Sequence, residues 1–178
     1  MKNSKLIALV CLLGLFFTSC DKEQKSEWKD LYNFTNEDVI GTYVYSNVIN
    51  AFDEVEGTGR HVCLDAQVNI QTSNEHPNSW IKFSVNCANE GFSRNFEGVA
   101  TPNEDDHMIR MTTGYIHSGG KIKAYNLTAY VMTNEKQELR LHGFVAENTY
   151  ELITDVETGA TTYKTIDGEY YYFDVIKN

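Results

Sequence analysis

The chain contains little that would interrupt regular structure, and it has no long hydrophobic run. Among its 178 residues there are only two prolines, Pro77 and Pro102, and both lie in polar stretches. The apolar stretch at residues 6–17 is twelve residues long, whereas a helix needs about 20 apolar residues to cross a bilayer. This stretch is therefore too short to predict a transmembrane helix.

Basic residues are also scarce. The chain has 15 Lys and Arg residues against 25 Asp and Glu residues, a formal net charge of -10. Two of the basic residues, Lys2 and Lys5, lie before the apolar stretch, so a chain processed after it carries a formal charge of -12. Anionic phosphates would repel such a protein, which argues against nucleic acid as a partner and against peripheral binding to acidic lipid.

Motifs of catalysis are missing as well. The sequence has no Gly-x-Ser-x-Gly elbow and no glycine-rich phosphate loop. The five histidines form no zinc-like pair, and the carboxylates before His107 are typical of a solvated turn. We therefore assign no catalytic residue, metal ligand or cofactor and expect a protein without catalysis, although 25 acidic residues leave a carboxylate pair for glycoside hydrolysis open.

The first twenty residues have the order of an export signal. Lys2 and Lys5 precede the apolar stretch, and small residues lead directly into a cysteine. The segment Phe17-Thr18-Ser19-Cys20 resembles the bacterial lipobox. This resemblance implies cleavage before Cys20, acylation of Cys20 with palmitate-type chains, and an outer-membrane lipoprotein on the periplasmic or cell-surface face. Two or three acyl chains are enough for stable anchoring.

The lipobox also sets the domain organisation that we expect. Residues 1–19 form the signal peptide, residues 20–34 an acylated tether that begins with a charged stretch, and residues 35–178 one domain. A mature chain of this length buries enough surface for a single core.

Beyond residue 40 the apolar residues recur with period two, which predicts strands. Nothing of helical length separates them, so the sheet is expected to be an antiparallel meander that closes into a barrel of 8–10 strands, with a β-sandwich as the alternative. Thr35 and Asp38 have capping-box spacing, which predicts a short N-terminal helix. The expected strands are residues 41–49, 60–72, 79–88, 92–101, 107–116, 121–133, 137–147, 149–157, 160–166 and 169–176.

The start of the first expected strand, Gly41-Thr42-Tyr43, resembles the Gly-x-Trp opening of lipocalins and calycin-like barrels. In that family the aromatic side chain closes one end of the barrel, and the lumen holds a small apolar molecule. A small meander behind a lipobox is similar to the lipocalin-like lipoproteins of Gram-negative bacteria. The resemblance implies a membrane-anchored protein that binds a small or apolar ligand.

Aromatic residues make up 12% of the chain and supply the candidate ligand-binding residues. The alternative function is that of a surface accessory lipoprotein, which binds a protein or a glycan through an exposed patch that includes Tyr170, Tyr172 or Trp80. The candidates for contact with a ligand are Tyr43, Trp80, Tyr125, Tyr171 and Phe173.

Two cysteines, Cys63 and Cys87, remain after processing, and an even count outside the cytoplasm suggests a disulfide. The strand pattern argues against it. In a continuous strand over residues 60–72, Cys63 lies on the polar face, whereas Cys87 shares the apolar face of its own strand. A bridge between these strands requires a bulge or a break in register, and both outcomes stay open.

Overall fold

The computed structural model describes residues 27–45, 58–99, 107–118 and 121–178. The signal peptide, Cys20 and the first part of the tether lie outside these ranges. No helix in the described ranges is long and apolar enough to cross a membrane. In chain order the elements are β1 (Lys29–Asp30), α2 (Asn36–Val39), β2 (Gly41–Tyr45), β3 (Arg60–Val62), β4 (Gln67–Thr72), β5 (Ile81–Cys87), η1 (Ala88–Glu90), β6 (Phe92–Gly98), β7 (Met108–Ser118), β8 (Lys121–Thr133), β9 (Leu139–Thr154) and β10 (Thr161–Lys177).

All ten strands belong to one sheet, which runs in the order β6-β5-β4-β2-β10-β9-β8-β7, with β1 also paired to β8 and β3 to β10. Every pair is antiparallel except β3 with β10. The strand after α2 meets the last strand of the chain, because Tyr45 in β2 pairs with Val175 in β10. The predicted antiparallel all-β fold is confirmed, and the strands form a single sheet.

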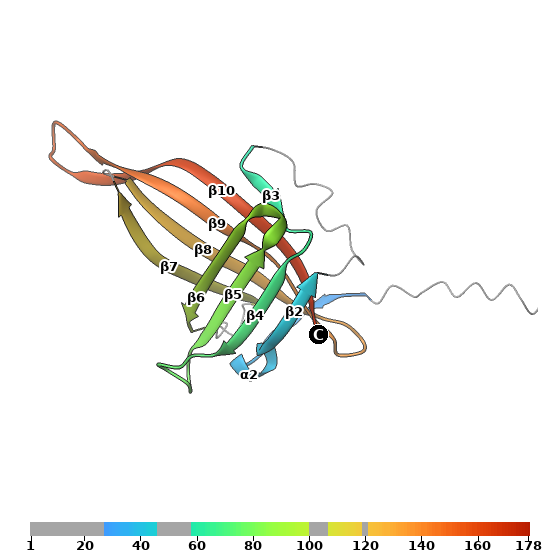
Figure 1. Ribbon diagram of the computed structural model, residues 1–178. Coiled ribbons are helices and arrows are strands. Elements are labelled where there is room, and N and C mark those ends of the chain that lie inside the picture. Colours follow the sequence, from blue (N-terminus) through green and yellow to red (C-terminus); the bar gives the residue numbers. More distant parts are fainter. Residues whose placement is uncertain (1–26, 46–57, 100–106, 119–120) are drawn as a thin grey trace, which may run out of the picture.

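The sheet curls so that β4, β5 and β6 lie across from β7, β8 and β9 (Figure 1). The expected closure is nevertheless wrong, since no ladder joins β6 to β7 within the described residues. The two edges belong to strands of unequal length, seven residues in β6 and eleven in β7. Twist accumulates along each strand, so an alternating sequence does not by itself determine where two such edges meet.

Alternate side chains along the strands point into the curl and form the core. Phe83 and Phe173 come from opposite sides of it, have no exposed surface, and place their ring centroids 6.4 Å apart. Full burial of a large apolar side chain contributes about 1.5–3 kcal/mol. A side chain with zero accessible surface also has no space for a water molecule against it. The expected apolar hollow is therefore absent along this part of the described core.

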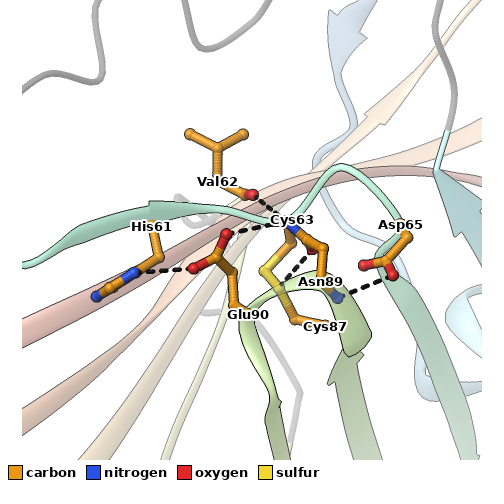
Figure 2. Close-up of a disulfide and its surroundings, with 7 residues drawn as sticks. All are labelled: His61, Val62, Cys63, Asp65, Cys87, Asn89 and Glu90. Carbon is orange, nitrogen blue, oxygen red and sulfur yellow. Dashed lines mark hydrogen bonds and ion pairs between the residues drawn. A yellow bond between two sulfur atoms is a disulfide. The ribbon is translucent and has the colours of Figure 1, made fainter.

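The predicted strand over residues 60–72 is in fact two strands, β3 and β4, separated by a turn. The turn is closed by a hydrogen bond from the Ala66 amide to the Cys63 carbonyl. Cys63 follows the end of β3, so the alternation along β4 does not fix its direction. It forms a disulfide with Cys87 at the end of β5, with 5.2 Å between the Cα atoms (Figure 2). The bridge thus uses the break in register that the sequence pattern required.

Helix α2 is a single turn, held by the predicted capping box. The Thr35 hydroxyl accepts a hydrogen bond from the Asp38 amide, and the Asp38 carboxylate accepts one from the Thr35 amide. Part of the expected tether packs on the sheet, because β1 pairs with β8 and Phe34 is buried in the core. The folded unit therefore begins before residue 35.

Candidate ligand-binding site

Four of the five candidate residues lie on the inner face of the sheet. Tyr43 and Phe173 are fully buried, and the Tyr43 hydroxyl donates a 2.8 Å hydrogen bond to the Val39 carbonyl. Burial raises the pKa of Tyr43 well above its usual value. These two aromatic rings fill the α2 end and the centre of the curl.

Tyr125 and Tyr171 lie toward the other end of the sheet, where Arg94 joins them. Arg94 alternates with Phe92 and Phe96 along β6, so it shares the inward phase of these buried rings. Its Nη2 donates a 2.9 Å hydrogen bond to the Tyr125 hydroxyl, and its guanidinium carbon lies 4.3 Å from the centroid of the Tyr125 ring. Arg94 therefore links β6 to β8 across the edge strands β6 and β7, between which no ladder is described.

Two further charged side chains complete this inner-face group. Glu147 of β9 continues the inward phase of Val145 and is 9% exposed. Its Oε1 accepts a 2.5 Å hydrogen bond from Lys123 Nζ, and its Oε2 lies 3.7 Å from Arg94 Nη2. The hydrogen bond and the charge of Glu147 raise the pKa of Lys123. Of the three charged side chains only that of Glu147 is largely buried, at 11% exposed, whereas those of Arg94 and Lys123 are 38% and 49% exposed. A buried carboxylate is costly unless it is paired, and here β6 and β8 supply the partners.

An aromatic stack borders these charges. Tyr171 lies between Phe92, at a centroid distance of 3.8 Å, and His61, at 4.7 Å, with both rings nearly parallel to it. The Tyr171 hydroxyl donates a 2.8 Å hydrogen bond to Glu169, and burial is the main cause of a raised Tyr171 pKa. We call Phe92, Arg94, Lys123, Tyr125, Glu147 and Tyr171 the inner cluster.

The disulfide helps to fix the position of His61 in this stack. It ties the chain just after β3 to the end of β5, immediately before η1. His61 Nδ1 of β3 lies 3.0 Å from the Glu90 carboxylate of η1, and Figure 2 shows this pair beside the disulfide. Asn89 of η1 also donates a 3.1 Å hydrogen bond to the Val62 carbonyl. These contacts hold the His61 ring in place against Tyr171.

The inner cluster can bind but shows no arrangement for metal chemistry. Within the described residues, no group of three His, Cys, Asp or Glu side chains could hold a metal ion. Arg94 Nε is buried and finds no acceptor in the described part of the chain. The Arg94 side chain as a whole is 38% exposed, so a ligand could contact the guanidinium through its Nη groups and not through Nε.

Sequence reasoning missed Arg94, Lys123 and Glu147. The signal was present, because Arg94 falls between two aromatic residues at period-two spacing and Glu147 follows Val145 in the same phase. A charged residue in an otherwise apolar phase marks a site where a partner must be supplied.

The fifth candidate, Trp80, is not part of the inner cluster. It lies half-buried beside a small cavity at the α2 end of the sheet. Tyr170 and Tyr172 point to the outer face, where both are partly exposed and contact the Phe144 ring at 5.9 and 5.6 Å. The aromatic residues therefore form separate groups inside and outside the sheet.

No family model, no curated protein and no solved structure matches this chain.

Proposed function

We propose that this protein is a lipid-anchored binding protein without catalysis, and that it takes a small amphipathic ligand at the inner cluster. The observation that carries the proposal is the position of Arg94, an inward-facing and partly exposed guanidinium on an edge strand, beside the Glu147 carboxylate and the Tyr125 hydroxyl. The lipobox resemblance at Cys20 supplies the anchor.

The side chains of the inner cluster suggest the character of the ligand. Arg94, Lys123 and the Tyr125 hydroxyl can donate hydrogen bonds, whereas Glu147 can accept them. An oxygen-rich head group offers further acceptors to the Arg94 Nη groups, which already bond the Tyr125 hydroxyl and the Ser93 carbonyl, and guanidinium groups favour planar, bidentate partners. Phe92 and Tyr171 offer ring surfaces for the apolar part of the same molecule.

The filled core sets where such a ligand would lie. Since Phe83 and Phe173 leave no water-sized space beside them, a ligand in the centre of the curl would have to displace core side chains. The inner cluster lies toward the Cys87 end of β5, next to edges that are not hydrogen-bonded to each other. The Arg94 and Lys123 side chains are 38% and 49% exposed there, so the proposal moves the expected ligand from the lumen to the end of the sheet.

The proposal can be tested by identifying small molecules that stay with the protein. The full-length chain is purified from its membrane, washed, and extracted for mass spectrometry of bound compounds. We expect one amphipathic class to be enriched with the wild-type protein and to fall about tenfold or more with Arg94→Gln, because a charge-assisted hydrogen bond is lost. Arg110→Gln is the matched control, since Arg110 is exposed on the outer face of neighbouring β7.

Equal recovery from the wild type and Arg94→Gln would contradict the proposal. A compound or protein whose recovery instead depends on Tyr172, tested with Tyr172→Ala, would favour the second function. That function is an accessory lipoprotein that binds a glycan or protein through the outer aromatic group, and the partial exposure of Phe144, Tyr170 and Tyr172 supports it.

A further inference from the structure

A second and smaller site lies at the other end of the sheet, between α2 and the turn that joins β4 to β5. The structure contains a cavity of about 190 Å³ there, next to Ile81 at the start of β5. The inner cluster lies toward Cys87 at the end of the same strand. We propose that this cavity binds one neutral sugar ring, a pyranose held by its hydroxyl groups and its apolar C–H face. This proposal does not depend on the ligand of the inner cluster.

Both walls of the cavity are fixed by hydrogen bonds within the chain. On the helix side, the capping box defines α2, and Lys177 Nζ donates a 2.8 Å hydrogen bond to the Asp38 carbonyl. On the turn side, the Ser73 hydroxyl accepts hydrogen bonds of 3.1 Å from the amides of Glu75 and His76. The Trp80 amide donates to the His76 carbonyl at 2.9 Å. A site built in this way is preorganised, which lowers the entropic cost of binding.

The lining combines an aromatic plane with neutral polar groups. Trp80 is half-buried and lines the cavity, and its ring lies 4.2 Å from the ring of His76. Asn36, Asn78 and Thr72 supply amide and hydroxyl groups around it. Pockets that fix a small ligand join an apolar surface to a few such polar groups. Sugars need this combination, because each ring has hydroxyl edges and an apolar face.

The Asn36 amide joins the two walls of the cavity. Asn36 Nδ2 donates a 3.1 Å hydrogen bond to the Ser79 carbonyl, which links α2 to the turn before β5. Asn36 Oδ1 is out of reach of solvent, so the contribution of Asn36 is to hold the two walls together and not to accept a hydrogen bond from the sugar.

Charge narrows the class of ligand. Among the described residues that line the cavity, Glu37 is the one with an ionisable side chain, so an acidic sugar or a phosphate would meet repulsion. A quaternary ammonium ion could contact Trp80 and Glu37, but the aromatic cages that bind such ions use several rings. The described lining offers one ring, Trp80, beside the neutral groups of Asn78 and Thr72. A neutral sugar therefore fits the described groups better than either ion.

Tryptophan fluorescence tests this directly, because the chain contains only Trp28 and Trp80. The full chain with Trp28→Phe, in a detergent whose head group is not a sugar, reports on Trp80 alone. We expect the methyl pyranosides of glucose, galactose or mannose to change its emission saturably, with at least one dissociation constant on the order of 1 mM. Choline and glucuronate should bind about tenfold more weakly or worse.

Substitutions assign the effect to the cavity. We expect Asn36→Ala to weaken sugar binding about tenfold, and Thr72→Val serves if that variant does not fold. Glu37→Gln should change sugar affinity less than about threefold, whereas it would abolish binding of a cation. Saturation-transfer NMR should show sugar binding to Trp28→Phe but not to Trp80→Ala. No saturable change with any of the three pyranosides up to about 100 mM, or tighter binding of choline, would overturn the proposal.

Discussion

At the residue scale, the outer face contains a buried ion pair that the alternation of the strands does not suggest. Asp174 is 2% exposed and accepts a 2.6 Å hydrogen bond from Arg140 Nε and a second bond from Nη2. His142 Nδ1 lies 3.3 Å from the same carboxylate, and the Trp28 ring lies 5.8 Å from the Arg140 guanidinium. Burial alone would raise the pKa of Asp174, but the bonds from Arg140 and His142 outweigh it and hold the pKa below its usual value.

Removing this carboxylate should be costly. We expect Asp174→Asn to lower the free energy of unfolding by about 3–5 kcal/mol at neutral pH, because it leaves Arg140 buried without its counter-ion. Urea denaturation measures the change. The matched control is Asp167→Asn, an exposed aspartate in the same strand, which should have an effect below about 0.5 kcal/mol.

The lowered pKa also fixes the pH dependence of this difference. A carboxyl group with a lower pKa in the folded state stabilises the protein above its unfolded pKa, and this contribution is lost as the pH falls through the folded value. The gap between the wild type and Asp174→Asn should therefore be full at neutral pH and narrow as the pH falls below the ordinary aspartate value of 3.8. A gap that stays constant down to the acid transition would contradict the assignment.

Single residues also show the limit of what alternation predicts. The phase of β6 correctly places Phe92 and Phe96 inside, and it would have placed Arg94 there as well. The alternation over residues 60–72 gave the wrong direction for Cys63, because alternation holds only within an unbroken strand and the turn after Val62 interrupts it. The ion-pair partners of Arg94 come from β8 and β9, and no local pattern on β6 specifies them.

At the scale of the elements, β8 and β9 approach each other unusually closely at one point. A Cβ added to Gly143 of β9 would lie 2.1 Å from the Thr128 carbonyl oxygen and 2.8 Å from the Ala129 Cα. Both of these atoms belong to the backbone of β8, so neither can move aside as the end of a flexible side chain could. Glycine inside a strand often marks such a close approach at a bend of the sheet.

We therefore expect Gly143→Ala to destabilise the protein by about 2 kcal/mol or more, since the strands must separate to admit the methyl group. Thermal and urea denaturation would measure the loss. Gly98→Ala in β6 is the control, because a Cβ there meets nothing within 4 Å. Equal stability of the two variants would show that β8 and β9 are not packed as described.

The long strands illustrate why boundaries were harder to predict than strand type. The boundary expected between residues 160–166 and 169–176 falls at Asp167 and Gly168, yet both residues lie inside β10, opposite Thr149 and Asn148 of β9, and a bulge precedes Asp167. An Asp-Gly pair accommodates a bulge as well as a turn, and the sequence does not distinguish the two. The boundary expected between residues 149–157 and 160–166 was predicted correctly, because a turn separates β9 from β10 there, with Gly159 at φ 69°.

At the scale of the whole molecule, the direction of the strands relates the anchor to the site. The described chain begins near β1, whose Lys29 pairs with Thr133 at the end of β8. Lys123 of the inner cluster lies near the opposite end of the same strand. Along β8 these positions are about 30 Å apart at the rise of an extended strand. If Cys20 is acylated as proposed, the lipid joins the chain ahead of the Thr133 end of β8, which is the end farther from the inner cluster.

The sequence predicted much of this arrangement, and the part that it missed has a physical cause. Period-two alternation is a local property, so it identified the antiparallel strands and most of the core. Closure and interior volume depend on how twist and side-chain size combine over all strands, so the predicted closed barrel was wrong and the predicted hollow is absent beside Phe83 and Phe173. The formal charge of -10 is a global property that the sequence states directly, and it argues against attachment to an anionic surface by charge.

The proposed function requires an exported chain that is held by acyl groups at Cys20. The intact mass of the protein purified from its membrane tests this most directly. We expect a mature chain that begins at Cys20 and carries diacylglycerol and fatty acid, with Cys20→Ser abolishing incorporation of labelled palmitate. A chain that retains residues 1–19, or one that begins at another residue without lipid, would contradict the account.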